Sequence, residues 1–215
     1  MKILIGVFHG VQYPDRLAAC RETWAADAKS LGVDLVFLTG RDEAIQQPQR
    51  DGDILSLPVP NGYRHLTQRI RAFCLWALTV PDWDYLFKAD DDTYVAVERL
   101  IAESWTGDYI GRKWNDDCDC ACGGAGYLLS RRAAAIVAAK AVDSVRMKNP
   151  NPKYPVMENQ IVGRVLELAG IPLTHDTRFV ATGPNGDWPK PDNNLITVHK
   201  AKPAMMRNIH KSLFS

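Results

Sequence analysis

Short apolar runs alternate with amphipathic stretches from the first residues of the chain. Residues 2–8 form a continuous apolar run that ends at His9 and Gly10, and residues 14–31 then carry apolar side chains at helical spacing. The apolar run predicts a buried strand, and the spacing of three and four residues predicts an amphipathic helix. The first 31 residues are therefore expected to form a strand, a turn and a helix.

The same alternation continues through the next 140 residues or so. We expect strands at 34–38, 54–59, 85–89 and 108–111, helices at 64–79, 131–141 and 157–169, and loops at 41–53 and 112–122. Residues 93–103 are expected to begin extended and turn helical. Strands that alternate with helices predict an α/β sandwich with a mostly parallel central sheet flanked by helices. A chain of 215 residues favours a single domain.

The overall charge and hydropathy exclude several classes of partner. The net charge is +1, so no global field favours nucleic acid or anionic lipid. The segment 190–211 is locally basic, which suits either a phosphate-bearing ligand or a solvated polar tail. No run approaches the 18 or so apolar residues of a membrane span.

Five cysteines are present, and three of them, Cys118, Cys120 and Cys122, occupy alternate positions. An odd number with this spacing does not define a disulfide framework, so a reducing compartment is expected. Zinc is an alternative, but structural zinc sites have four ligands and wider gaps. We expect free thiols in a loop.

Three consecutive aspartates, Asp90, Asp91 and Asp92, follow the apolar residues 85–89. Two like charges about 4 Å apart repel by roughly 4 kcal/mol at an effective dielectric near 20, so ordered carboxylates here need a counter-charge, a proton or solvation. A divalent metal with oxygen ligands would satisfy them. An acidic turn or helix cap is the alternative, because Asp favours both. Aromatic and β-branched residues on both sides favour the metal site.

Other α/β sites are excluded by missing motifs. The chain has no phosphate loop of the form GxxxxGK[ST], no GxGxxG after the first strand and no GxSxG elbow. A cation held by carboxylates keeps open positions, and a substrate diphosphate such as that of a nucleotide-sugar is a common partner. A carboxylate-metal phosphohydrolase would explain the aspartates alone.

Six segments follow one another in an order typical of a known family. They are Arg16 with 21–24, 63–69, 87–95, 123–130, 158–163 and 199–203. In this order the chain resembles the β-1,3-galactosyltransferase and Fringe-like glycosyltransferases over about residues 16–206. The resemblance implies a GT-A fold, with a nucleotide-binding part at about 1–95 and an acceptor and catalytic part at about 96–215. It also implies inverting transfer of a hexose from a UDP-sugar to a hydroxyl acceptor, with Mn²⁺ or Mg²⁺. The acceptor could be a glycan, a lipid-linked glycan, a small molecule or a hydroxylated base of phage-type DNA.

The resemblance also assigns expected roles to single residues. Asp92 and His199 would bind the metal, Asp90 would contact the metal shell or the ribose, and Asp91, the variable middle position, would belong to the donor-binding residues. The cations Arg21, Arg69 and Lys88 would contact the donor phosphates or pair with the aspartates. Ordinary surface or core-edge roles stay open for Arg21 and Arg69. The glycines Gly123 and Gly124 would lie beside the donor sugar, or else form a tight turn.

The chain departs from the family at the catalytic base. The family has Glu-Asp-Val at the start of a helix, with the Asp as base, whereas this chain has Glu158, Asn159 and Gln160. An amide cannot accept the proton of the acceptor hydroxyl. We expect Glu158 to take this role, with Asp116 or Asp117 as alternatives. A non-catalytic module that binds nucleotide-sugars or glycans is the rival hypothesis.

Secretory members of the family carry a membrane anchor and lumenal disulfides, and the sequence shows no sign of either. A soluble, cytoplasmic protein of bacterial or viral type is therefore expected.

Overall fold

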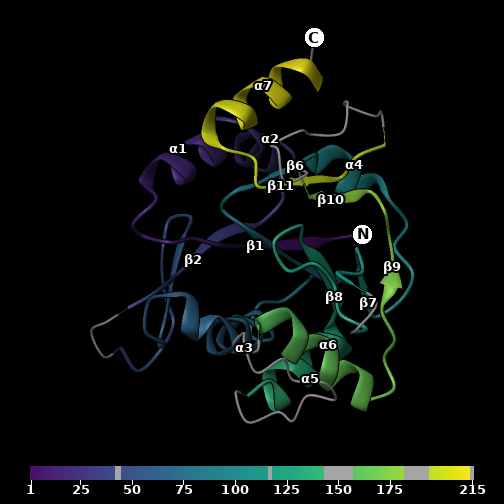
Figure 1. Ribbon diagram of the computed structural model, residues 1–215. Helices are drawn as coiled ribbons and strands as arrows, with labels where there is room; N and C mark the ends of the chain where they lie inside the picture. The colour runs from purple at the N-terminus through teal and green to yellow at the C-terminus, as the bar shows by residue number, and fades with distance from the viewer. Residues whose placement is uncertain (42–44, 116–117, 143–156, 182–193, 214–215) are drawn as a thin grey trace.

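A large mixed sheet forms the centre of the computed structural model, which describes residues 1–41, 45–115, 118–142, 157–181 and 194–213 (Figure 1). Within these residues the strands follow the order β3-β4-β2-β1-β5-β8-β7-β9. Their bounds are β1 Ile3–Phe8, β2 Leu35–Gly40, β3 Gln49–Asp51, β4 Ile54–Leu57, β5 Tyr85–Asp90, β7 Tyr109–Gly111, β8 Tyr127–Ser130 and β9 Thr174–His175.

The middle of the sheet is parallel. β1 pairs in parallel with both β2 and β5, and β2 pairs in parallel with β4, whereas β8 is antiparallel to its neighbours β5 and β7. In the β1–β5 pair, Phe8 lies opposite Asp90. The carboxyl end of β1 therefore meets the start of the aspartate triplet.

A second, smaller sheet lies against the first. It consists of β6 (Thr93–Val95), β10 (Phe179–Ala181) and β11 (Thr197–His199), in the order β10-β11-β6. β11 runs antiparallel to β6, with His199 opposite Thr93. This register brings a residue from near the carboxyl end of the chain to the aspartate turn.

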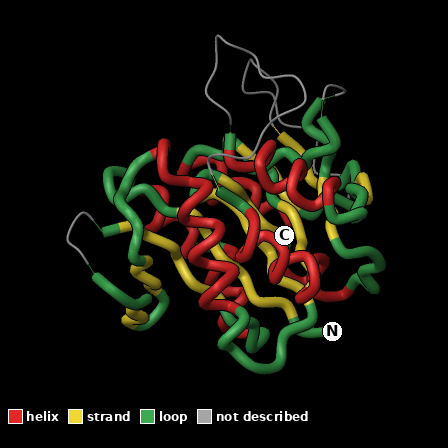
Figure 2. The backbone as a smooth tube through the Cα atoms, turned by 90° about the horizontal axis from the view of Figure 1, so that it is seen from below, coloured by secondary structure: helices red, strands yellow, loops and turns green. Residues whose placement is uncertain are grey.

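Helices cover both faces of the large sheet (Figures 1 and 2). One face packs against α3 (Leu66–Ala77), which follows a short 3-10 turn η1 (Tyr63–His65), and against α5 (Arg131–Lys140) and α6 (Glu158–Leu168). The other face packs against the small sheet and four helices, α1 (Pro14–Glu22), α2 (Trp24–Ser30), α4 (Val97–Ala102) and α7 (Pro203–Leu213).

Strand β1 shows why two cores form. Leu4 and Phe8 belong to the core beneath α3, and Ile3, Ile5 and Val7 belong to the core beneath α1. Successive side chains of a strand point to opposite faces, so a continuous apolar run is what a strand buried on both sides requires. The predicted α/β sandwich with helices on both faces is confirmed.

The structure differs from the predicted elements at several points. The helix expected over 14–31 is two helices, because the backbone leaves the helical region at Thr23, with ψ −119°, and the hydroxyl of Thr23 donates to the carbonyl of Ala19 at 2.6 Å. Part of the expected loop at 41–53 forms β3, whose residues are all exposed and therefore show no apolar pattern. Within the basic segment 190–211, residues 197–199 form β11 and α7 begins at Pro203, where the buried side chains of Met206 and Ile209 anchor the helix.

Candidate active site

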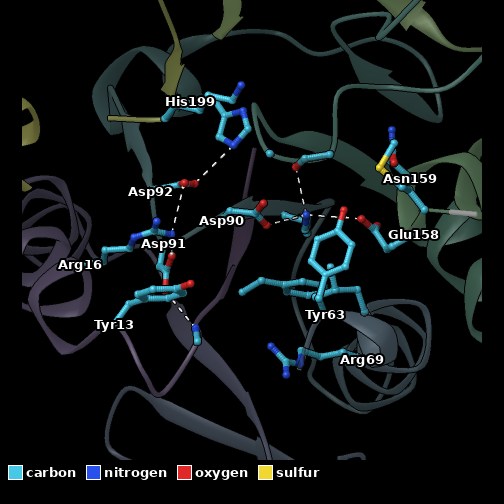
Figure 3. Close-up of a pocket in the computed structure, with 18 of the residues that line it drawn as sticks. Tyr13, Arg16, Tyr63, Arg69, Asp90, Asp91, Asp92, Glu158, Asn159 and His199 are labelled. Atoms are coloured by element: carbon cyan, nitrogen blue, oxygen red, sulfur yellow. Dashed lines mark hydrogen bonds and ion pairs between the residues drawn. The ribbon is translucent and has the colours of Figure 1, made fainter. Parts of the chain in front are cut away.

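The three aspartates occupy the end of β5 and the turn that follows it (Figure 3). Asp90 is the last residue of β5, and β6 begins directly after Asp92. Asp91 is buried, whereas Asp90 and Asp92 are partly exposed on the wall of a cavity of about 610 Å³. The triplet therefore offers two of its carboxylates to a ligand and directs the third inward.

Asp91 is held by donors from β1 and α1. Its Oδ2 lies 2.9 Å from Nδ1 of His9 and accepts a hydrogen bond from the backbone N–H of Gly10 at 3.0 Å. Its Oδ1 accepts a hydrogen bond from Arg16 at 3.0 Å. The carboxylate that the resemblance assigns to donor binding thus has both oxygens engaged with donors from the protein itself.

Asp90, Asp92 and His199 each bring one ligand atom to within 4.8 Å of the others. Nε2 of His199 lies 3.4 Å from Oδ1 of Asp92, and Nδ1 has no hydrogen-bond partner among the described residues. Two carboxylate oxygens and an imidazole nitrogen form a donor set that suits Mn²⁺. The residues present therefore fit a divalent cation.

The protonation states of this cluster depend on one another. Burial lowers the pKa of His199, but the hydrogen bonds to Asp92 and Cys122 raise it by more, to about 9. Burial raises the pKa of Asp92, but the contacts with His199 and Arg16 lower it by more. Without a cation, His199 and Asp92 therefore form an ion pair at neutral pH.

Lys88 links the aspartates to α6. Its ammonium group lies 2.8 Å from Oδ1 of Asp90 and 3.5 Å from Oε2 of Glu158, and it donates to the carbonyl of Gly123 at 3.0 Å. The side chain is fully buried, which alone would lower its pKa, but the two carboxylates raise the pKa above the ordinary value. Lys88 is therefore charged and pairs with the carboxylates, one of the two roles expected for it.

Glu158 and Asn159 open helix α6 on the far side of the cavity from Asp92 (Figure 3). Glu158 accepts a hydrogen bond from the hydroxyl of Tyr127, and burial raises its pKa even though Lys88 lowers it. The amide of Asn159 donates to the carbonyl of Ala121 at 2.8 Å. Asn159 thus anchors the segment that leads into the glycines.

Gly123 and Gly124 are needed because side chains crowd their backbone. A Cβ atom on Gly124 would lie 2.1 Å from the ring of His199. On Gly123 it would lie 3.1 Å from Oε2 of Glu158 and from Cβ of Asn159. The two glycines therefore let the loop pass between the metal cluster and the start of α6.

Only some of the basic side chains that could contact the donor phosphates line the cavity. Arg69, from α3, is buried on the cavity wall and donates to the carbonyl of His9 at 3.3 Å, and its Nε has no hydrogen-bond partner among the described residues. Burial lowers the pKa of Arg69. Lys200 also lines the cavity, in a left-handed conformation with φ 60°. Arg21 does not line it and instead pairs with Asp53 at 2.6 Å, in accord with the surface role left open for it.

A second cavity of about 630 Å³ lies beside the first, near the carboxyl ends of β1, β2 and β4. Its wall includes Thr39 and Ser56, and Asn61 borders both cavities. In open α/β sheets ligands bind at this end of the strands.

The prediction of free thiols is wrong for two of the three clustered cysteines. Cys118 and Cys120 form a disulfide with their Cα atoms 5.3 Å apart, and Cys122 is free on the cavity wall. Side chains two residues apart in an extended segment point to the same side, which brings the two thiols together. One ground for expecting a reducing compartment is thereby removed.

Other residues of the cavity wall have no site role predicted from the sequence. Tyr13, Arg16, Tyr63, Trp114 and Cys122 line the cavity. Arg16 belongs to one of the six family segments, but only the fold shows that it contacts Asp91 and Asp92, at 3.0 and 3.3 Å. The alternative bases Asp116 and Asp117 lie outside the described residues.

The fold is that of GT-A glycosyltransferases, as predicted. A glycosyltransferase involved in the glycosylation of the major capsid of PBCV-1 superimposes with a TM-score of 0.59 at 13% identity, covering 97% of this chain and 99% of that one.

Sequence comparison then identifies the relatives. The galactosyltransferase family model matches residues 15–113. UDP-GalNAc:beta-1,3-N-acetylgalactosaminyltransferase 2 of Danio rerio is 28% identical over 120 residues, 44% of this chain and 24% of that protein. Beta-1,3-galactosyltransferase 6 of Mus musculus is 23% identical over 230 residues, 89% of this chain and 67% of that protein. The chain thus spans about a quarter of the first relative's length. These matches confirm the resemblance to β-1,3-galactosyltransferases that the six segments predict.

No helix within the described ranges is long and apolar enough to cross a membrane.

Proposed function

We propose that the protein is a metal-dependent inverting glycosyltransferase that moves a hexose from a UDP-sugar to a hydroxyl acceptor. One observation carries the proposal: the Asp90, Asp92 and His199 cluster opens into the same cavity as Glu158. A cation site and a buried carboxylate in one cavity are the two groups that such a transfer requires.

The donor diphosphate would lie against the metal cluster. A divalent cation bound by Asp92, Asp90 and His199 would offset the charge that develops on the departing UDP. Arg69 and Lys200 line the same cavity, and a phosphate would supply the anion that Arg69 lacks among the described residues. The neighbouring cavity between β1, β2 and β4 has room for the nucleoside.

Glu158 is the proposed base. The acceptor oxygen attacks the anomeric carbon, the bond from that carbon to the diphosphate oxygen breaks, and UDP leaves with the electron pair. The acceptor proton passes to Oε2 of Glu158, which is the oxygen beside Gly123 at the cavity wall. The raised pKa of Glu158 supports this role, because a base works best when its pKa is close to the working pH.

The test compares sugar transfer and UDP release by the wild type and by Asp92→Ala, each with Mn²⁺ or with EDTA. We expect transfer to require Mn²⁺ and to be lost in the variant. Undiminished transfer by Asp92→Ala would exclude the metal assignment.

For the base, Glu158→Gln should lower the transfer rate by about 10²- to 10⁴-fold while the Kd for UDP stays the same. Glu167→Gln makes the same chemical change at the other end of α6 and serves as the control. Near-normal turnover in Glu158→Gln would show that Glu158 is not the base.

A nucleotide-sugar-binding module without catalysis is the second candidate. It is favoured by Asn159, an amide at the position where the family has its base. Binding of UDP and Mn²⁺ by calorimetry, with no product from any acceptor and no hydrolysis of any UDP-sugar, would support this second function.

A further inference from the structure

Exposed aromatic side chains of the described residues gather around one cavity. In the part of the chain that the structure describes, Tyr13, Tyr63 and Trp114 are the aromatic members of the large exposed apolar residues, at 44%, 65% and 39% exposure. All three line the cavity that holds the metal cluster. Apolar surface left in water costs free energy, so its concentration around one polar cavity indicates a ligand-binding surface.

The three rings divide into two groups. The guanidinium of Arg16 lies over the ring of Tyr13, 4.2 Å from its centroid, and Arg16 in turn pairs with Asp91 and Asp92. Tyr13 therefore belongs to the metal side of the cavity. Tyr63 lies away from Tyr13, toward Glu158 (Figure 3).

Hydrogen bonds hold Trp114 on the same side of the cavity as Glu158. Its backbone N–H donates to the carbonyl of Cys120 at 2.9 Å, and the next carbonyl, that of Ala121, accepts the amide of Asn159 at 2.8 Å. Trp114 is thus held next to the segment that Asn159 fastens to the start of α6. Tyr63 and Trp114 border the side of the cavity from which an acceptor would reach Glu158.

We propose that Tyr63 and Trp114 form the acceptor subsite and that the acceptor is a glycoside whose sugar ring stacks on these aromatic rings. This inference rests on the proposed function and names the substrate class for the acceptor side of that site. The C–H face of a pyranose is flat and apolar, and its weakly positive hydrogens suit the negative face of an aromatic ring. The hydroxyl groups around its edge can donate to Glu158.

Nucleic acid fits this surface less well, although a base could also stack on the rings. Asp90 and Glu158 line the same cavity as Tyr63, and the ring of Tyr63 lies toward Glu158 (Figure 3). Their carboxylate oxygens can accept hydrogen bonds from the hydroxyl groups of a neutral sugar, whereas the phosphate backbone of a nucleic acid has no donor to offer them.

The test separates acceptor binding from donor chemistry. UDP-galactose and UDP-glucose are supplied with Mn²⁺ and a panel of methyl β-glycosides, and transfer is measured beside hydrolysis of the donor by water. Tyr63→Ala and Trp114→Ala should each raise the KM for the glycoside roughly ten-fold, whereas the KM for the UDP-sugar should change less than about two-fold. Tyr63→Phe keeps the ring face and should retain the wild-type KM for the glycoside. Leu75→Ala, which removes an exposed apolar side chain of α3 outside the cavity, is the matched control.

A binding measurement keeps the inference separate from the proposed function. Saturation-transfer NMR on the protein with UDP and Mn²⁺ should detect a methyl glycoside in the wild type and in Glu158→Gln, but not in Tyr63→Ala. Such binding without turnover would contradict the transferase and leave the subsite standing. The inference is overturned if no glycoside binds, if Tyr63→Ala raises the KM of the UDP-sugar instead, or if the rings bind a single-stranded oligonucleotide in place of the glycoside.

Discussion

Oδ2 of Asp91 lies 2.9 Å from Nδ1 of His9, and both side chains are buried although 82 residues separate them in the chain. The middle aspartate of the triplet is thus a structural group. It joins the end of β1 to the end of β5 and holds Arg16 at the edge of the metal cluster. Its neighbours Asp90 and Asp92 are the partly exposed members of the triplet.

Replacing Asp91 by Ala should destabilise the protein strongly. The variant leaves Arg16 and the backbone N–H of Gly10 without their acceptor, and breaking a buried charge pair from one side costs about 3–5 kcal/mol. Urea unfolding followed by circular dichroism measures the loss. Asp53→Ala breaks the exposed pair with Arg21 and should cost no more than about 1 kcal/mol. Equal losses in the two variants would contradict the structural role of Asp91.

The sequence predicts the parts of the fold in which local pattern and burial agree. β1 and β5 are apolar runs buried on both faces, and α3 and α6 show clear amphipathic spacing, so these elements were predicted. β9 has two exposed residues, which leave no pattern to detect. The break at Thr23 depends on one backbone angle that the apolar spacing on either side does not reveal.

The candidate site was predicted through motifs rather than periodicity. Asp90, Asp92, Glu158 and His199 line one cavity as the resemblance implies, whereas Arg21 lies elsewhere. The partners of Asp91 could not be inferred, because His9 and Arg16 reach it only through the pairing of β1 with β5. Contacts between residues that are distant in sequence depend on how the strands pair, which the local sequence pattern does not reveal.

The disulfide between Cys118 and Cys120 can be tested by counting thiols. Denatured without reductant, the protein should react with three equivalents of iodoacetamide, at Cys20, Cys74 and Cys122. Pre-reduction should raise the count to the five cysteines of the sequence. Mass spectrometry of tryptic peptides locates the labels. Five labels without reduction would show that the bond is absent from the purified protein.

Metal affinity should depend on pH through His199. The pKa of His199 in the metal-free protein is about 9, above the ordinary value of 6.5. Below pH 9 the imidazole is protonated, and a cation must displace that proton to bind. The apparent affinity for Mn²⁺ should therefore rise with pH, by up to roughly ten-fold per unit, between about pH 6.5 and 8.5.

Calorimetry at several pH values measures this slope, and His199→Gln is the control. The variant should bind Mn²⁺ more weakly and lose most of the slope. Asp92 does not contribute in this range, because its pKa lies below the ordinary carboxyl value and it is already ionised. If the pH dependence of Mn²⁺ affinity is unchanged in His199→Gln, His199 is not a metal ligand.

Gly124→Ala should disable the metal cluster without touching any of its ligands. The new Cβ would lie 2.1 Å from Cε1 and Nε2 of His199, a distance that forces either the ring or the loop to move. A shift of the ring would carry Nε2 away from Asp92, so we expect the affinity for Mn²⁺ to fall at least roughly ten-fold.

Gly123→Ala is the control variant, because the new Cβ would have its nearest contacts, at 3.1 Å, with Glu158 and Asn159 and not with His199. It should leave Mn²⁺ binding nearly intact and lower the rate of sugar transfer instead. Since Gly124 is free of positive φ strain, an unchanged Mn²⁺ affinity in Gly124→Ala would mean that the loop yields and the position of His199 does not depend on it.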